Sequence, residues 1–122
     1  MSYYFGEQRR QAPRINIILP VTLTDEENLV YIGQTNDLSN RGLGIILNSP
    51  IVERAEFQAL IALPPRMNEA AITLDCYIFV IFCNSHPNEV GHWRAGGYFS
   101  RLHESERKQL DLFLQAQPLP AT

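Results

Sequence analysis

Basic residues other than arginine are nearly absent from the 122-residue sequence, because Lys108 is the single lysine among ten basic side chains. Acidic residues outnumber basic ones by 13 to 10, which gives a formal net charge of -3. A general binder of long nucleic acids carries a strong positive excess. The charge balance therefore argues against a nucleic acid polymer as the partner.

Long hydrophobic runs are absent as well. The longest one, Tyr77–Phe82, is far shorter than the roughly 20 residues that a membrane-spanning helix needs. The segment Met1–Arg14 is polar and lacks the apolar core of a signal peptide. We therefore expect no membrane insertion and a cytoplasmic location.

Cysteine is scarce, with only Cys76 and Cys83. In one strand they would lie about 23 Å apart and, because their spacing is odd, on opposite faces, so they could not form a disulfide. Together with His86 and His92 they match no common zinc spacing. These histidines and His103 show no spacing typical of a nucleophile or general base, and no glycine-rich phosphate loop is present. We expect reduced thiols, no metal, no cofactor and no enzymatic activity.

The sequence does contain short segments rich in β-branched and alternating apolar residues, separated by turn residues. They predict six strands, at residues 15–24, 29–37, 43–47, 56–63, 72–82 and 92–102. Pro20 interrupts the first of these and predicts an edge position or a bulge. Six short strands followed by one helix are typical of a small barrel. The predicted fold class is all-β, a six-stranded antiparallel β-barrel with a C-terminal α-helix.

The length of the chain fits one domain. We expect residues 1–14 to form a flexible N-terminal arm, residues 15–103 the β-barrel and residues 104–117 the C-terminal helical segment. In that last segment Ser105 is the candidate cap of a helix from Glu106 to about Ala116. The helix carries a small apolar stripe of Leu110, Phe113 and Leu114.

The predicted fifth strand has apolar side chains on both faces. Tyr77, Phe79 and Ile81 alternate with the residues expected in the core, so they need a cover of their own. The C-terminal helix is one candidate cover, and a second copy of the chain is the other.

Two motifs combine charged and turn-forming residues. Arg10 and Arg14 are four residues apart and follow Arg9, so three arginines fall within six positions. The second motif, Asp37-x-Ser39-x-x-Gly42, lies in a segment that predicts a tight loop. Arginine presents a planar fork of donors that matches a phosphate and can stack on a flat base.

The order and spacing of these motifs in a small barrel resemble the PilZ domain family, whose members are receptors for cyclic di-GMP. Gly96 and Phe99, three residues apart, resemble the last barrel strand of that family. The resemblance extends from Glu7 to about Gln115. It implies a PilZ-type barrel, cyclic di-GMP as the ligand and no cofactor.

The resemblance also implies roles for single residues. Arg10 and Arg14 take phosphate and stack on guanine, with Arg9 as a helper. Asp37 accepts hydrogen bonds from the guanine N1–H and N2–H, which adenine cannot supply together. The complete set of candidate ligand-binding residues is Arg9, Arg10, Arg14, Asp37, Ser39, Asn40, Arg41 and Gly42.

Several of these residues have a structural interpretation beside the functional one. Ser39 either contacts a guanine edge or phosphate, or bonds its own backbone as a turn residue. Gly42 permits a backbone conformation or a close approach that a Cβ would block. Asn40 and Arg41 lie in the same loop, and the motif does not fix their identity. Trp93 either stacks on guanine or belongs to the core.

The predicted function is that of a cyclic di-GMP receptor whose ligand orders the arginine arm against the second motif. The changed surface would be read by a separate effector protein. The alternative is a PilZ-like scaffold that binds proteins and no nucleotide. The presence of both motifs favours the receptor.

Overall fold

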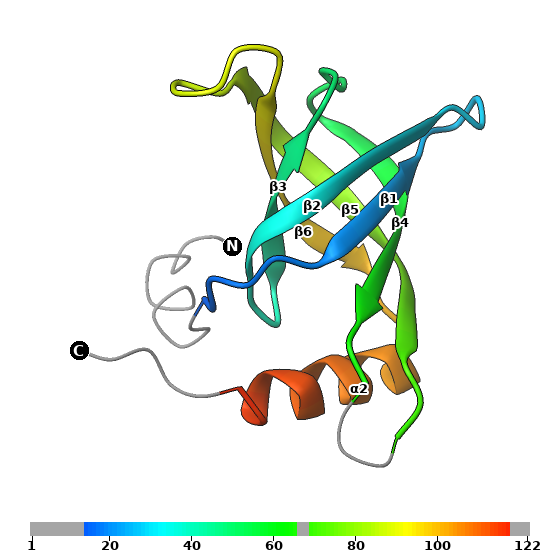
Figure 1. The fold of residues 1–122 in the computed structure, drawn as a ribbon. Helices are drawn as coiled ribbons and strands as arrows, with labels where there is room; N and C mark the ends of the chain where they lie inside the picture. The colour runs from blue at the N-terminus through cyan, green and yellow to red at the C-terminus, as the bar shows by residue number, and fades with distance from the viewer. Residues whose placement is uncertain (1–13, 66–68, 118–122) are drawn as a thin grey trace, which may run out of the picture.

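The computed structural model describes residues 14–65 and 69–117 of the chain. They form a closed antiparallel barrel with strand order β1-β2-β3-β6-β5-β4, followed by one helix (Figure 1). The strands are β1 (Pro20–Thr24), β2 (Val30–Leu38), β3 (Gly42–Leu47), β4 (Ala55–Leu63), β5 (Ile72–Ser85) and β6 (Trp93–Arg101), and the helix is α2 (Glu104–Gln115). The predicted fold class is confirmed.

Alternation of side chains explains the barrel. In β4 the buried Phe57, Ala59, Ile61 and Leu63 alternate with residues that are more exposed. Each strand of a sheet buries every second side chain, so six such strands enclose one apolar core when they close. Closure also pairs β1 with β4, and no strand of the barrel is left as an edge.

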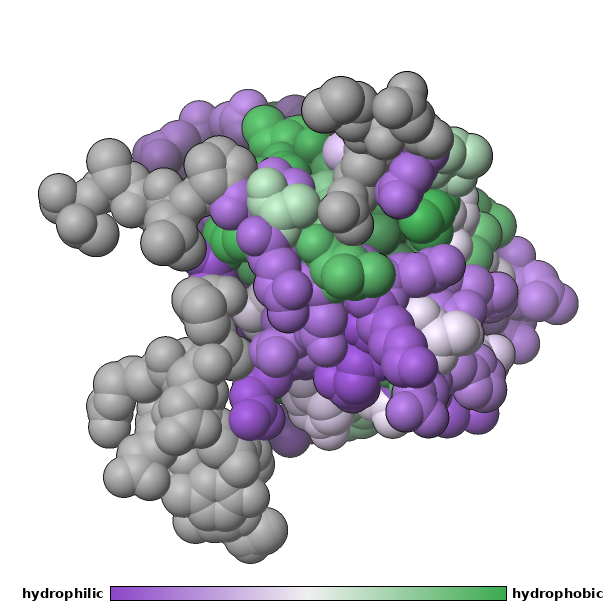
Figure 2. Space-filling model, turned by 90° about the horizontal axis from the view of Figure 1, so that it is seen from below, coloured by the Kyte–Doolittle hydropathy of each residue, from purple (hydrophilic) through white to green (hydrophobic). Residues whose placement is uncertain are grey.

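Helix α2 lies across one end of the barrel (Figure 1). Its Leu110 and Phe113 are buried and belong to the core cluster of the barrel. The expected cap is wrong, because α2 begins at Glu104 after His103 and the Ser105 hydroxyl donates to the Glu106 carboxylate at 3.0 Å. Seen from this end, hydrophobic side chains gather beside a broad hydrophilic area (Figure 2).

The outer aromatic side chains of β5 are covered by β6. The ring of Phe79 packs against Tyr98 with a centroid distance of 5.5 Å, and the guanidinium of Arg101 lies 4.0 Å from the centroid of Tyr77. Arg101 also forms an ion pair with Glu56 on β4, at 2.7 Å. Hydrogen bonds from Arg101 and from a neighbouring serine lower the pKa of Glu56. The third outer residue, Ile81, stays 51% exposed.

The strand boundaries differ from the predicted ones by one residue at several places, and by more at the start of β1 and the end of β5. β1 begins at Pro20, whose missing N–H is tolerated at the first position of a strand. β2 extends to Leu38, so Asp37 belongs to a strand and not to the loop. β5 continues to Ser85, into the segment expected as a loop. No helix of the described residues is long and apolar enough to span a membrane.

Candidate functional site

A pocket of about 210 Å³ lies on the outside of the barrel, across β2, β3, β6 and β5. Arg14 and Asp37 line one side of it, and Phe82 and Arg94 also belong to its wall. Its residues lie on elements far apart in the sequence, so only the closed barrel brings them together.

The centre of the pocket is a row of four residues, one from each strand. Asp37 pairs with Gly44, Gly44 with Gly96, and Gly96 with Phe82. The two glycines in the middle form the floor, and the lack of a Cβ lets neighbouring side chains lie directly against it. A Cβ on Gly44 would collide with Asn36 Oδ1 and lie 2.9 Å from Asp37 Oδ2, and one on Gly96 would collide with the Phe82 ring. The row therefore runs from a carboxylate at one end to an aromatic ring at the other.

A β-bulge at Asn36 turns Asp37 toward the solvent. Thr35 is fully buried and pairs with Ile45, whereas the next register pair is Asp37 with Gly44. In a regular strand Thr35 and Asp37, two residues apart, would share a face, and Asp37 would point into the core like Thr35. Bulges re-aim side chains in this way, often beside functional sites.

A second bulge, at Ile81, does the same for Phe82. Val80 pairs with Gly97 and Phe82 with Gly96, so Ile81 is the extra residue. Phe82 is thereby turned outward and is 39% exposed. The same bulge makes one prediction wrong, because Cys83 packs against the core on the side of Cys76 and not on the opposite face. Both thiols are free.

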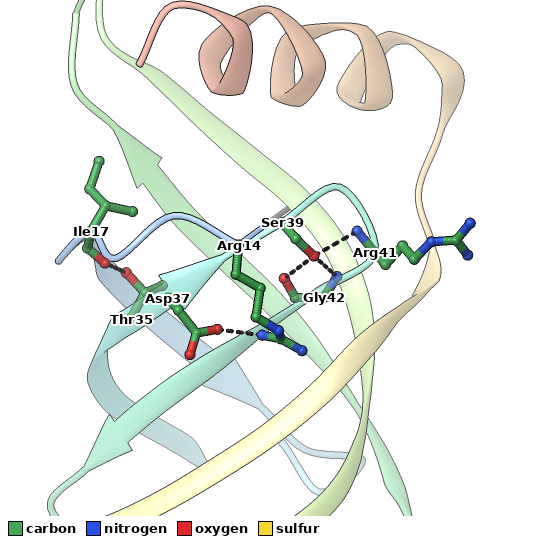
Figure 3. A network of polar contacts seen from close by, with 7 residues as sticks. All are labelled: Arg14, Ile17, Thr35, Asp37, Ser39, Arg41 and Gly42. Atoms are coloured by element: carbon green, nitrogen blue, oxygen red, sulfur yellow. Dashed lines mark hydrogen bonds and ion pairs between the residues drawn. The ribbon is translucent and has the colours of Figure 1, made fainter. Parts of the chain in front are cut away.

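The segment that follows Arg14 is hydrogen-bonded to β2. Ile15 and Leu38 exchange two backbone hydrogen bonds of 2.8 and 2.9 Å. The Thr35 hydroxyl donates to the carbonyl of Ile17 at 2.7 Å and accepts from the N–H of Leu19 at 2.9 Å (Figure 3). This buried hydroxyl fixes the path of the chain next to the pocket, a role that no sequence motif indicates.

Arg14 and Asp37 form an ion pair, in which Arg14 Nη1 donates to Asp37 Oδ1 (Figure 3). Their side chains are 52% and 24% exposed. One residue of each sequence motif thus lies at the same edge of the pocket. Exposure keeps both groups accessible to a ligand.

Ser39 and Gly42 shape the turn that follows Asp37. The Ser39 hydroxyl accepts from the N–H groups of Arg41 and Gly42, at 3.1 and 3.2 Å, and Ser39 is 2% exposed. A Cβ on Gly42 would lie 2.9 Å from the Tyr98 Cα and would collide with the carbonyl of Gly97. Gly42 is thus a place of close backbone approach between β3 and β6.

The remaining predicted residues either lie outside the described residues or do not line the pocket. Arg9 and Arg10 lie outside the described residues. Asn40 and Arg41 do not line the pocket, and the Arg41 side chain points away from Asp37 (Figure 3). Trp93 is half-buried and does not line it either.

The pocket residues that the sequence-based prediction does not include are most of its lining, among them Asn36, Phe82 and Arg94. Phe82, and not Trp93, is the aromatic residue that lines the pocket. The barrel register, with the bulges at Asn36 and Ile81, places these residues at the pocket, and the alternation pattern of the sequence does not contain it. Within residues 14–65 and 69–117, no group of three or more His, Cys, Asp or Glu side chains could hold a metal ion.

Comparison with protein families finds a match over most of the chain. The PilZ domain family matches residues 8–116. This range includes the arginine motif and the motif that begins at Asp37. No curated protein matches the sequence significantly.

Solved structures share the fold at low sequence identity. The inhibitor of motility MotI/DgrA from Bacillus subtilis has a TM-score of 0.71 and 18% identity, over 88% of this chain and 51% of its own. YcgR from Escherichia coli in complex with c-di-GMP has a TM-score of 0.64 and 19% identity, over 88% and 45%. The PilZ domain of YcgR with c-di-GMP has a TM-score of 0.63 and 17% identity, over 88% and 91%. This chain spans about half the length of the first two.

Proposed function

Because the chain belongs to the PilZ domain family, we propose that it is a receptor for cyclic di-GMP. One observation carries the proposal: Arg14 and Asp37, one residue from each motif, lie side by side at the edge of a pocket. The PilZ domain of YcgR, which has the same fold, has been solved with this ligand. PilZ domains bind cyclic di-GMP without a cofactor and are not enzymes.

The carboxylate of Asp37 suits a guanine. Its Oδ1 accepts from Arg14, and its Oδ2 lies beside Gly44 on the pocket floor. A carboxylate has lone pairs for several donors, so Asp37 can keep Arg14 and still accept from the guanine N1–H and N2–H. Adenine lacks this pair of neighbouring donors. Asp37 therefore selects guanine in the proposed complex.

The guanidinium of Arg14, beside Asp37 at the edge of the pocket, suits a phosphate of the ligand. Its Nη1 donates to Asp37, and an arginine has five N–H donors in all. The other donors of the fork are suited to a phosphate oxygen in a charge-assisted contact. The ion pair with Asp37 holds the guanidinium at the pocket before the ligand arrives, which lowers the entropy lost on binding.

The outward ring of Phe82 offers a surface for the base. The ring lies over Gly96, at the opposite end of the row from Asp37. Aromatic rings stack on bases, and a stacked base contributes about 1–3 kcal/mol to binding. A guanine over the glycine floor thus meets a carboxylate at one end and a ring at the other.

The rest of the ligand needs a further cover. A pocket of about 210 Å³ is smaller than the roughly 300–1,000 Å³ typical of drug-sized ligands, and a cyclic dinucleotide with two guanines is larger than most of these. We propose that Arg9 and Arg10 close over the second phosphate and that this ordering changes a surface read by a separate effector protein. The expected cytoplasmic location stays a prediction.

The motif residues without a place in the pocket have supporting roles in this proposal. Ser39 and Gly42 hold the turn that follows Asp37, so they position the carboxylate. Asn40 and Arg41 remain candidates for contacts with the part of the ligand outside the pocket.

Isothermal titration calorimetry with cyclic di-GMP tests the proposal. We expect saturable binding with a Kd near micromolar, about -8 kcal/mol. Arg10→Ala and Asp37→Ala should each weaken binding by about ten- to a hundredfold, because each removes charge-assisted hydrogen bonds of about 1.5–3 kcal/mol. Arg107→Ala on α2 and Glu26→Gln in the β1–β2 turn remove the same charges far from the pocket and should bind like wild type.

Three other nucleotides serve as controls for the specificity of binding. GTP, GMP and cyclic di-AMP should give no comparable heat. Absence of binding at high concentrations of cyclic di-GMP would reject the receptor and favour the scaffold that binds no nucleotide.

A further inference from the structure

Arg94 is a pocket residue that neither sequence motif contains. It lies on β6, two residues before Gly96, and pairs with Ile46 on β3 and Asn84 on β5. Its side chain is exposed and lines the pocket. Among the residues that the structure describes, its side chain makes no hydrogen bond or ion pair. A second guanidinium thus stands at the pocket without a protein partner to engage its donors.

The register places Arg94 beside the central row and not within it. Neighbouring strands are about 4.8 Å apart and residues two apart in a strand about 6.8 Å apart, so Arg94 lies within reach of a base above Gly44 and Gly96. Ala95 is buried, so the alternation of β6 directs Arg94 to the outer face, like Gly96. Arg94 and Phe82 are therefore diagonal neighbours on the same face of the β5–β6 pair.

Guanine has hydrogen-bond acceptors that the Arg94 guanidinium could bind. If its N1–H and N2–H donate to Asp37, its acceptors O6 and N7 lie on the adjacent edge and face along the strands. Arginine binds O6 and N7 of guanine with two parallel hydrogen bonds, and such a pair discriminates by about 1–3 kcal/mol against a wrong base. Adenine presents an amino donor where guanine presents O6.

We propose that Arg94 is a specificity-determining residue, which binds the O6 and N7 edge of the guanine held by Asp37. The inference rests on the proposed function, and it adds a contact that comes from β6 and not from either motif. The guanine is then bound on two edges, its donors by a carboxylate and its acceptors by a guanidinium.

A cycle of protein and ligand changes tests this contact. Calorimetry would compare wild type, Arg94→Ala and Arg94→Lys with cyclic di-GMP and with its analogue in which 7-deazaguanine replaces both guanines. We expect Arg94→Ala to weaken binding of cyclic di-GMP about tenfold. Wild type should bind the 7-deaza analogue more weakly than cyclic di-GMP, and Arg94→Ala should bind the two alike. Lysine keeps the positive charge but cannot donate two parallel hydrogen bonds. Arg94→Lys should therefore restore less than half of the binding free energy that Arg94→Ala loses.

Three results would overturn the inference. Arg94→Ala could bind cyclic di-GMP like wild type, or it could weaken both ligands by the same factor, which would make Arg94 a phosphate contact. Wild type could also bind both ligands equally, which excludes N7. Thermal unfolding of each variant checks the fold, with Arg107→Ala as the matched arginine control. If wild type binds no cyclic di-GMP at all, the proposed function itself fails, a result distinct from a failure at Arg94.

Discussion

Replacing Asp37 by asparagine separates its contribution to ligand binding from its contribution to stability. The amide has nearly the same shape as the carboxylate, but it loses the charge and replaces one acceptor by a donor. In the free protein Asp37 forms an ion pair with Arg14, and the two side chains are 24% and 52% exposed. Ion pairs at such exposed positions contribute about 0–1 kcal/mol to stability, because water screens them. We expect Asp37→Asn to lower the free energy of unfolding by less than about 1 kcal/mol.

The same substitution should have a larger effect on binding. Asp37 is proposed to accept two hydrogen bonds from guanine, of which the asparagine carbonyl can replace one, and a hydrogen bond to a charged group contributes about 1.5–3 kcal/mol. The asparagine amide would also face a guanine donor with its own N–H. Affinity for cyclic di-GMP should therefore fall about ten- to a hundredfold.

Urea unfolding and calorimetry on the same preparations measure the two effects, with Glu26→Gln as the control for loss of one negative charge. Cyclic di-IMP, which lacks the N2 amino group, gives an independent check. Wild type should bind it more weakly than cyclic di-GMP, and Asp37→Asn should lose most of this preference. A large loss of stability with unchanged affinity would refute the reasoning, since Asp37 would then be a structural residue.

Three further predictions concern the surroundings of the pocket. Gly44→Ala should weaken binding of cyclic di-GMP in calorimetry, because its Cβ would displace the Asn36 amide and the Asp37 carboxylate, and unchanged affinity would contradict the shape of the floor. Thr35→Val should lower the free energy of urea unfolding by about 2 kcal/mol, because it removes the hydrogen-bond partner of the buried Leu19 N–H and of the partly buried Ile17 carbonyl, whereas Thr35→Ser should cost less. Burial raises the pKa of the Cys76 thiol to about 12, so a thiol reagent at pH 8 should label Cys83 first and Cys76 only after unfolding. Since the pKa of Cys76 is raised in the folded state, its contribution to stability should be present below about pH 8.5 and be lost as the pH rises toward 12. Equal labelling of both thiols in the native protein would contradict this burial.

The barrel could be predicted because its core follows a simple alternation. The pattern in β4, where Phe57 and Ile61 are buried, depends only on which face each side chain occupies. The position of α2 could not be predicted in the same way. Its apolar stripe shows that the helix is covered on one side, but not whether Leu110 packs on the outside of β5 or closes the end of the barrel, as it does.

The site could be predicted only where it coincides with the motifs. Arg14 and Asp37 belong to them, and the structure places these two together. Arg94 lines the same pocket because of the strand register. Phe82 lines it because the register is combined with a bulge at Ile81. One extra residue in a strand reverses the face of every residue after it, and alternation read from the sequence assumes that no such residue exists.

The central claim is that the pocket between Asp37 and Phe82 binds cyclic di-GMP. The most direct measurement is a titration of the ¹⁵N-labelled protein with cyclic di-GMP, followed by NMR. The account predicts saturable shifts of the backbone amides of Gly44 and Gly96 and of the Arg94 side-chain N–H. The amides of Ile32 and Leu60, on the outer face of β2 and β4, should not move. Shifts confined to that face, or no shifts at saturating ligand, would contradict the account.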